Sequence, residues 1–283
     1  MKVLRILLIL LLAAGLLFSL WQLGSYYMAR RQSSEVTDTL YTQALTTPAP
    51  TAPVTNAPET ETTDDPPAAS AEPTGEPEPE WAEYAPFSMD FDVLWEQSEA
   101  VVAWLYCENT PINYPVAQAK DNRYYEERLL DGSWNAGGTL YLDCRNQKDF
   151  TDFQSIFYGH NMVDDSMFGV LDEYYEQEFY EEHPVMYLLT PEQYYKVELV
   201  AGVVNPMDSW LYEQDYSDPA RKADLVYTWR QLSTFEPVVD YSEEDRFLVL
   251  STCTYDYDNA RYLLVGKLTP VGGALPLLRD GLS

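Results

Sequence analysis

The alternation of apolar and polar positions divides the chain into three stretches. Residues 6–23, "ILLILLLAAGLLFSLWQL", form an apolar run without a charged residue. Residues 46–80 are rich in Pro, Thr, Ala and Glu and hold almost no large apolar side chain. From about Trp81 to Leu278, short apolar runs alternate with turn residues. This pattern predicts an apolar helix, a polar linker and one folded part.

The apolar run is long enough to cross a membrane. Its 18 residues would make a helix of about 27 Å, close to the thickness of a hydrocarbon core. A cleaved signal peptide should end in a small-x-small site, and "GSYYMA" after Leu20 is too bulky for one. We therefore favour an uncleaved anchor. No Lys or Arg lies between Gln32 and Ala119, which suits a short cytoplasmic N-terminus and an extracellular body on a single-pass anchor in the cell membrane.

The polar stretch cannot bury enough apolar surface to fold on its own. We expect a disordered Pro/Thr/Glu-rich linker over residues 32–80, with a reach on the order of 100 Å if it is extended. The predicted boundaries are thus 1–31 for a cytoplasmic tip and transmembrane anchor, 32–80 for the linker and 81–283 for the folded domain.

Within the folded part, periodicity and turn residues predict mostly strands. Pro115 suggests that its strand is an edge strand or a bulged one. Asp218 is a candidate N-cap, with Pro219 at the first helical position. A fold that is mainly β, resembling a barrel with inserted helices, follows from these elements. Helices are expected at 91–98, 166–183 and from 218; strands at 101–106, 112–118, 137–144, 153–161, 184–190, 194–204, 246–255 and 260–268.

Charge and cysteine content narrow the function. The net charge is −29 and the pI is near 4.1, which argues against binding nucleic acid or anionic headgroups through the soluble part. Three cysteines leave at least one free thiol; Cys107 and Cys144 could pair, although their spacing does not require it. The chain holds no CxxC, and we expect no metal and no cofactor.

One cysteine and one arginine are placed to act together. "FLVLSTC" is a buried strand that ends at Cys253, and six residues later "ARYLLVGKL" begins a return strand with Arg261 near its start. Strands joined by so short a loop are antiparallel neighbours, so the two side chains should lie close together. A nearby guanidinium favours a thiolate and can stabilise an oxyanion. The alternatives are a buried structural cysteine and a salt bridge from Arg261 to Asp256 or Asp258.

A histidine would complete a nucleophilic site by moving protons. The chain has only two histidines. His160 follows an apolar strand in "SIFYGHNM", as Cys253 follows another, and it is the better candidate. His183 lies among glutamates in "YEEHPV", where an ordinary solvated loop histidine is expected.

Several motifs resemble the sortases, and class B sortases most closely. "FYGHNMVDDSMFGVL" is similar to the histidine motif of the family, and "LSTCTYDYDNARYLLVGKL" to its cysteine and arginine motif. "AWLYCENTPINYPVAQAKDNRYYEE" resembles the start of the class B domain. The resemblance covers about Phe91 to Leu268 and implies a sortase-type closed β-barrel.

The resemblance also implies an activity and partners. It implies a cysteine transpeptidase that cleaves a C-terminal sorting signal of secreted proteins at a Thr–x bond and passes the acyl group to an amine. The amine would belong to a peptidoglycan precursor or a pilin, at the membrane of a Gram-positive cell. A cysteine peptidase that releases its product to water and a catalytically idle wall-binding or adhesion module are the alternatives.

Residue roles follow from the same resemblance. It implies that Cys253 is the nucleophile, His160 the general acid and base, and Arg261 the oxyanion and substrate anchor. It further implies that substrate contacts Ser251, Thr252 and Asn122. Two positions depart from the family pattern: Cys107 and Glu126 stand where apolar side chains are expected.

Overall fold

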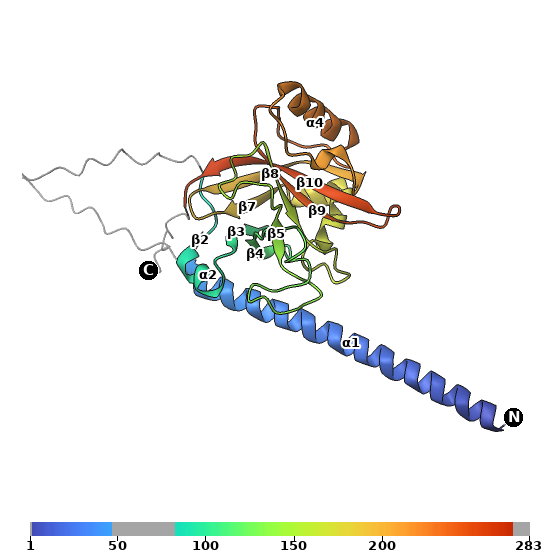
Figure 1. Ribbon diagram of the computed structural model, residues 1–283. Coiled ribbons are helices and arrows are strands. Elements are labelled where there is room, and N and C mark those ends of the chain that lie inside the picture. The colour runs from blue at the N-terminus through green and yellow to red at the C-terminus, as the bar shows by residue number, and fades with distance from the viewer. Residues whose placement is uncertain (1, 47–82, 274–283) are drawn as a thin grey trace, which may run out of the picture.

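The computed structural model describes residues 2–46 and 83–273 and is built around a closed β-barrel (Figure 1). The strands neighbour one another in the order β10-β8-β7-β3-β4-β5-β6-β9. The predicted mainly β fold and closed barrel are confirmed. The strands are β3 (Val101–Tyr106), β4 (Asn113–Ala117), β5 (Leu140–Leu142), β6 (Gln154–Tyr158), β7 (Val185–Leu189), β8 (Tyr194–Pro206), β9 (Phe247–Cys253) and β10 (Ala260–Val271).

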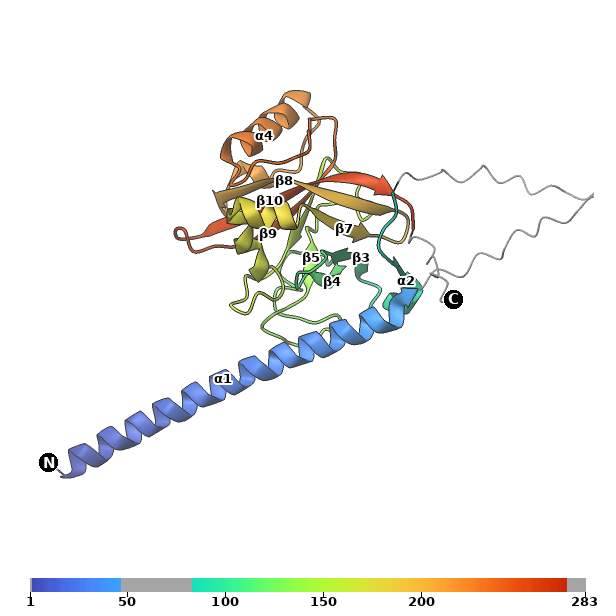
Figure 2. The same cartoon turned by 180° about the vertical axis from the view of Figure 1, so that it is seen from behind.

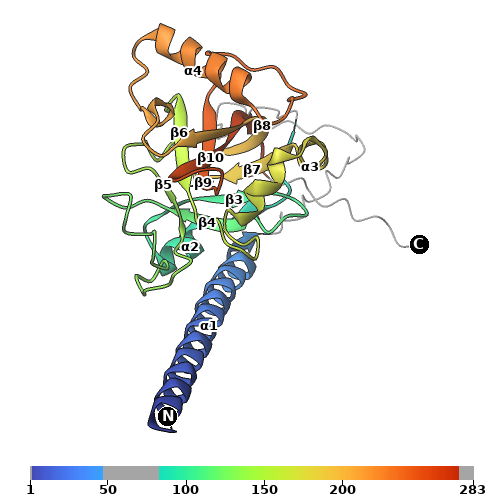
Figure 3. The same cartoon turned by 90° about the vertical axis from the view of Figure 1, so that its right-hand side faces the viewer.

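Short helices lie outside the barrel wall. α2 (Phe91–Gln97) precedes β3, and α4 (Pro219–Leu232) covers one end of β8 (Figure 3). α4 begins as predicted, because the Asp218 carboxylate accepts a hydrogen bond from the backbone N–H of Ala220. The predicted helical stretch 166–183 divides into the 3₁₀ helix η1 (Gly169–Tyr175) and α3 (Gln177–Glu182), and η2 (Trp210–Tyr212) is a further short 3₁₀ turn.

The N-terminal helix is longer than predicted. α1 (Lys2–Ala44) continues through the first thirteen residues of the expected linker, so the prediction that disorder starts at Gln32 is wrong. The reason is a stripe of Val36, Leu40 and Ala44 at helical spacing. These side chains pack in one apolar cluster with Leu94 of α2 and with β3, and Leu40 and Ala44 are buried.

A short two-stranded sheet begins directly after α1. β1 (Leu45–Thr46) pairs antiparallel with β2 (Ser88–Met89) in a separate two-stranded sheet. The backbone N–H of Asp90 also donates to the carbonyl of Ala44 at 2.7 Å. Most of the expected linker, residues 47–80, lies outside the described residues.

Among the described helices, α1 is the one long and apolar enough to span a membrane. Its most apolar window has a mean hydropathy of 1.6, and no part of that window is buried against the protein. Figures 1 and 2 show this part of α1 projecting from the domain as a straight helix.

The prediction that the strand holding Pro115 is an edge strand or a bulged one is wrong. β4 is not an edge strand, because it lies between β3 and β5. Its pairing with β5 begins only at Val116, so the missing N–H of Pro115 interrupts no bond on that side. The register shift in the β3–β4 pairing lies in β3, where Val101 and Ala103 pair with the consecutive residues Ala117 and Val116, so the strand that holds Pro115 is not the bulged one either.

Candidate active site

The nucleophile candidate and the arginine are direct neighbours across two strands. Cys253 is the last residue of β9, and its register partner in the antiparallel pair is Arg261 of β10. Side chains at opposed antiparallel positions share one face of the sheet, about 4.5–5.5 Å apart at Cβ. The proximity predicted from spacing alone is therefore confirmed.

The histidine reaches the same place from the other side of β9. β6 pairs parallel with β9, with Tyr158 opposite Ser251, so His160 lies two residues beyond that pair, as Cys253 does. The hydroxyl of Thr252 donates to the carbonyl of Gly159 at 2.9 Å and locks the two strand ends together. The barrel register thus brings the three candidate side chains to one end of neighbouring strands.

Glycine precedes this histidine for a steric reason. A Cβ at Gly159 would lie 2.4 Å from Cδ2 of Leu140 and 2.7 Å from Cδ2 of Phe168. Both neighbours are fully buried and belong to the barrel core. Only glycine lets the chain pass this point, where β6 turns outward toward His160.

The ring of His160 has one defined hydrogen bond. Nε2 lies 2.8 Å from the backbone carbonyl oxygen of Glu126. A carbonyl only accepts, so Nε2 carries a proton and Nδ1 is the ring nitrogen left for proton exchange. The hydrogen bonds found within residues 83–273 include none between the ring and Sγ of Cys253.

Arg261 is held by uncharged groups. Its Nη1 donates to the carbonyl of Ala260 at 2.9 Å, and Nη2 lies 3.2 Å from Sδ of Met207. The carboxylate of Asp256 instead accepts from Tyr175 and Thr254. None of the salt bridges between described residues involves Arg261, so the alternative of a salt bridge within the turn is not realised and the guanidinium remains available for an anion.

All three side chains line one cavity of about 430 Å³. Its wall also includes Asn122, Ser251 and Thr252, the three predicted substrate contacts. Ser251 and Thr252 are buried, and the Ser251 hydroxyl lies 2.8 Å from that of Tyr212. The side-chain oxygen of Asn122 accepts from the backbone N–H of Cys144 at 2.7 Å. These residues therefore also hold the wall in shape.

An aromatic and charged wall was missed by sequence reasoning. The rings of Tyr141 and Tyr158, on paired strands, lie 5.3 Å apart, and Tyr158 stacks on Tyr212. The hydroxyl of Tyr158 donates to Asp143, which also forms a two-pronged ion pair with Arg145 at 2.6 and 2.9 Å. The tyrosines within the apolar runs "TLYL" and "IFYGH" could have indicated this wall from the sequence. Nothing in the sequence around Tyr212 indicates that it belongs to the wall.

The ion pair controls the charge of this wall. Burial alone would raise the pKa of the Asp143 carboxyl, but hydrogen bonds from Arg145 and Tyr158 and the Arg145 charge hold it below its usual range. Burial, followed by the Asp143 charge, raises the pKa of Tyr158. At neutral pH the wall therefore carries the guanidinium of Arg145 and the neutral phenol of Tyr158, with the buried carboxylate of Asp143 behind them.

Asn161 connects the histidine loop to the nucleophile. Its Nδ2 donates to the backbone carbonyl of Cys253 at 2.9 Å and to Oδ2 of Asp172 at 2.8 Å. Burial, together with the charges of Asp256 and Asp165, raises the pKa of Asp172. Asn161 thus fixes the end of β9 relative to the loop that carries His160.

The remaining candidates lie elsewhere. His183 ends α3, with Nδ1 3.2 Å from the carbonyl of Phe179, and does not line the cavity. All three cysteines are free, so the possible Cys107–Cys144 pair does not form. Cys107 is buried in the core, and burial raises the pKa of its thiol. The family pattern has an apolar side chain at this position, and Cys107 takes its place as a buried core residue.

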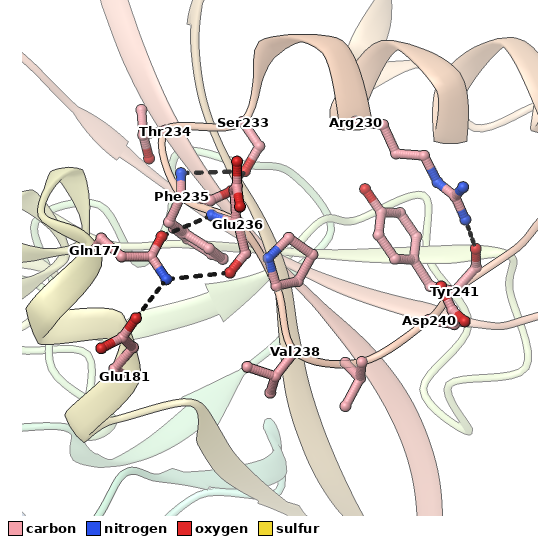
Figure 4. Close-up of a pocket in the computed structure, with 12 residues that line it drawn as sticks. Gln177, Glu181, Arg230, Ser233, Thr234, Phe235, Glu236, Val238, Asp240 and Tyr241 are labelled. Carbon is pink, nitrogen blue, oxygen red and sulfur yellow. Dashed lines mark hydrogen bonds between the residues drawn. The ribbon is translucent and has the colours of Figure 1, made fainter.

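A larger cavity, of about 850 Å³, lies between α3 and residues 233–241 (Figure 4). Its polar side chains bond to one another: Gln177 donates to Glu181 at 3.0 Å and accepts from the backbone N–H of Glu236 at 2.8 Å. None of its described lining residues is a cysteine or histidine. Size alone therefore does not identify the site; the chemistry of the smaller cavity does.

Comparison of the sequence with known proteins finds relatives of this chain. No family model matches the chain. Sortase B of Listeria monocytogenes is 33% identical over 177 residues, which cover 62% of this chain and 72% of the relative. Sortase B of Staphylococcus aureus is 26% identical over 183 residues, 64% of this chain and 75% of the relative.

The solved structures that are similar to this chain are also sortase B structures. A Staphylococcus aureus sortase B–substrate complex aligns with a TM-score of 0.62 at 25% identity, covering 65% of this chain and 86% of that one. Sortase B from Listeria monocytogenes aligns with a TM-score of 0.57 at 32% identity, covering 62% and 98%.

Proposed function

This chain belongs to the class B sortases, which are cysteine transpeptidases, and on that premise we propose that it cleaves the C-terminal sorting signal of secreted proteins and joins them to a cell-wall or pilin amine. We propose further that α1 anchors it in the cell membrane with the barrel outside. One observation supports the assignment above all: Cys253 and Arg261 are register partners, and His160 lies two residues beyond the end of β6, the strand on the other side of β9.

In the proposed first step, the thiolate of Cys253 attacks the carbonyl carbon of the scissile peptide bond. Arg261, free of carboxylate partners within the described chain, stabilises the negative charge that develops on the carbonyl oxygen. The proton that the Cys253 thiol has lost is held on Nδ1 of His160; as the C–N bond breaks, His160 gives this proton to the leaving amine. The products are a thioester on Cys253 and a released C-terminal peptide.

In the second step an amine attacks the thioester carbon. His160 takes the proton that this amine loses, and the Cys253 sulfur leaves as a thiolate. Water in place of the amine would give hydrolysis instead. The aromatic wall narrows the cavity around the acyl group, which favours a bound amine over bulk water.

The test is incubation of the full chain with a library of sorting-signal peptides and an amine acceptor, followed by mass spectrometry. We expect a ligated product from the wild type and none from Cys253→Ala. Cleaved peptide without ligation would support the peptidase alternative. Absence of both products, with no labelling of Cys253 by a thiol-reactive substrate mimic, would support the idle module.

The two histidines supply a matched pair of variants. His160→Ala should reduce kcat by at least about 100-fold, because it removes the general acid and base. His183→Ala should retain nearly full activity, since its ring contacts Phe179 and lies outside the cavity. Equal loss in both variants would contradict the assignment of proton transfer to His160.

A further inference from the structure

The point at which α1 meets the domain is fixed by two polar contacts. Exposed apolar side chains continue along α1 as far as Met28, which is 74% exposed. In the next residue, the carbonyl of Ala29 accepts a hydrogen bond from Nδ2 of Asn135 at 2.7 Å. Nε of Arg30 then lies 2.5 Å from Oδ2 of Asp164. The apolar part of the helix therefore ends where its contact with the domain begins.

Beyond these contacts α1 stays attached to the domain. Ser33, Val36 and Thr37 lie against Tyr114 and the neighbouring loops, and the helix ends in the apolar cluster around α2. The ring of Tyr41 lies 5.8 Å from that of Trp104 in β3. The helix and the barrel thus form one body, and the position of the helix sets the position of the barrel.

Two strongly exposed apolar side chains lie beside these contacts. Trp134, 64% exposed, precedes Asn135, and Val163, 91% exposed, precedes Asp164. The turn between β9 and β10, which carries the exposed Tyr255, projects toward the same side as the N-terminal half of α1 (Figures 1 and 2). Two exposed apolar side chains, Trp134 and Val163, therefore directly precede the residues that contact α1 where its apolar part ends.

We propose that this edge of the domain, defined by Trp134 and Val163, is a membrane-contact surface that rests on the interfacial region of the bilayer crossed by α1; this inference rests on the proposed anchoring by α1. Residues 6–28 would form about 34 Å of helix, enough for the hydrocarbon core with a small excess. Trp is enriched at such interfaces, and burying an exposed Val and Trp there is favourable.

The proposal has a consequence for the substrate. His160 lies three residues before Val163, and Met162 lines a small cavity together with Arg30 of α1. The rim of the catalytic cavity therefore lies next to the bilayer surface. The acyl donor that fits this placement is a polypeptide segment just leaving the membrane, rather than one extended far into the wall.

Depth-dependent quenching tests the proposal on the full chain in nanodiscs of phosphatidylcholine, whose headgroups carry no net charge to repel the acidic domain. A fluorophore is attached to single cysteines introduced as Trp134→Cys, Val163→Cys or Val238→Cys, in a Cys144→Ser, Cys253→Ala background. Val238 is 75% exposed but lines the cavity beside α3, away from α1, and is the matched control. The remaining natural cysteine is 1% exposed and should not react.

Lipids with a nitroxide at the headgroup should quench the labels at 134 and 163 about twofold or more and leave the label at 238 unchanged. A fourth label, from Leu16→Cys, should be quenched by a nitroxide deep in the acyl chain. If the label at 16 is quenched but those at 134 and 163 behave like the one at 238, the contact surface is overturned while the anchor stands. An unquenched label at 16 overturns both, and equal quenching at 163 and 238 overturns the defined edge.

Discussion

The sharpest prediction concerns Gly159, the residue before the proposed acid–base histidine. We consider Gly159→Ala, which adds one methyl group at the end of β6. The new Cβ would lie 2.4 Å from Leu140 and 2.7 and 2.9 Å from two atoms of the Phe168 ring. Both neighbours are 0% exposed, so neither can swing into solvent. The strain must be relieved by moving the backbone or the core.

The magnitude follows from this geometry. Overpacking a dense core by one methyl group costs about 1–3 kcal/mol. For a domain of this size, each 1 kcal/mol lowers Tm by about 2–4 °C, so a fall of several degrees is expected. The loss of activity should be larger than the loss of folded protein alone would cause. His160 follows Gly159 directly, and a displacement of about 1 Å at a catalytic group can lower the rate about 100-fold.

The assay combines thermal unfolding with transpeptidation kinetics at a temperature where the variant remains folded. Gly273→Ala is the matched control, since its Cβ would meet only Oγ of Ser88, at an ordinary 3.6 Å. Its Tm and kcat/KM should equal those of the wild type. A Gly159→Ala protein with unchanged Tm and unchanged kcat/KM would refute both the packing argument and the placement of His160 that depends on it.

Three further predictions concern Arg261 in the cavity wall and two residues that support the site from behind it, Asn161 and Asp143. Arg261→Lys keeps the charge but loses the planar fork, and we expect kcat/KM to fall about 100-fold in peptide ligation assays. Asn161→Ala frees the carbonyl of Cys253 and should lower kcat while KM stays nearly constant; a change confined to KM would contradict a positioning role. Asp143→Asn should destabilise the protein by about 2 kcal/mol at neutral pH. Because the pKa of Asp143 is lowered in the folded protein, its contribution is present above the unfolded value near 3.9 and lost as the pH falls through the folded value; urea unfolding of the two proteins should therefore converge in acid.

The barrel strands could be predicted because each is a short apolar run ended by turn residues. The six-residue turn after Cys253 was enough to predict its pairing with Arg261, since a short loop leaves antiparallel pairing as the simplest solution. The meeting of His160 with Cys253 is different. It depends on the parallel pairing of β6 with β9, which are separated by about ninety residues. No local pattern specifies that contact.

The cavity wall was less predictable for a similar reason. Tyr212 reaches it from a 3₁₀ turn after β8, far in sequence from the paired Tyr141 and Tyr158. The role of Asn161 could have been suspected only from its position beside His160, because its partners lie eleven and ninety-two residues away. Long-range side-chain bonds of this kind leave no periodicity in the sequence.

The revised extent of α1 changes what the polar segment does. A linker between a membrane helix and a domain sets how far the domain can reach. Here, however, the helix packs on the domain, and β1, at the near end of the segment, pairs with β2, just beyond its far end. The length of the segment between β1 and β2 therefore does not set the distance between α1 and the barrel. If α1 spans the bilayer as proposed, the distance between barrel and bilayer is set by the contacts of Ala29 and Arg30 with the domain, which directly follow the exposed apolar part of the helix.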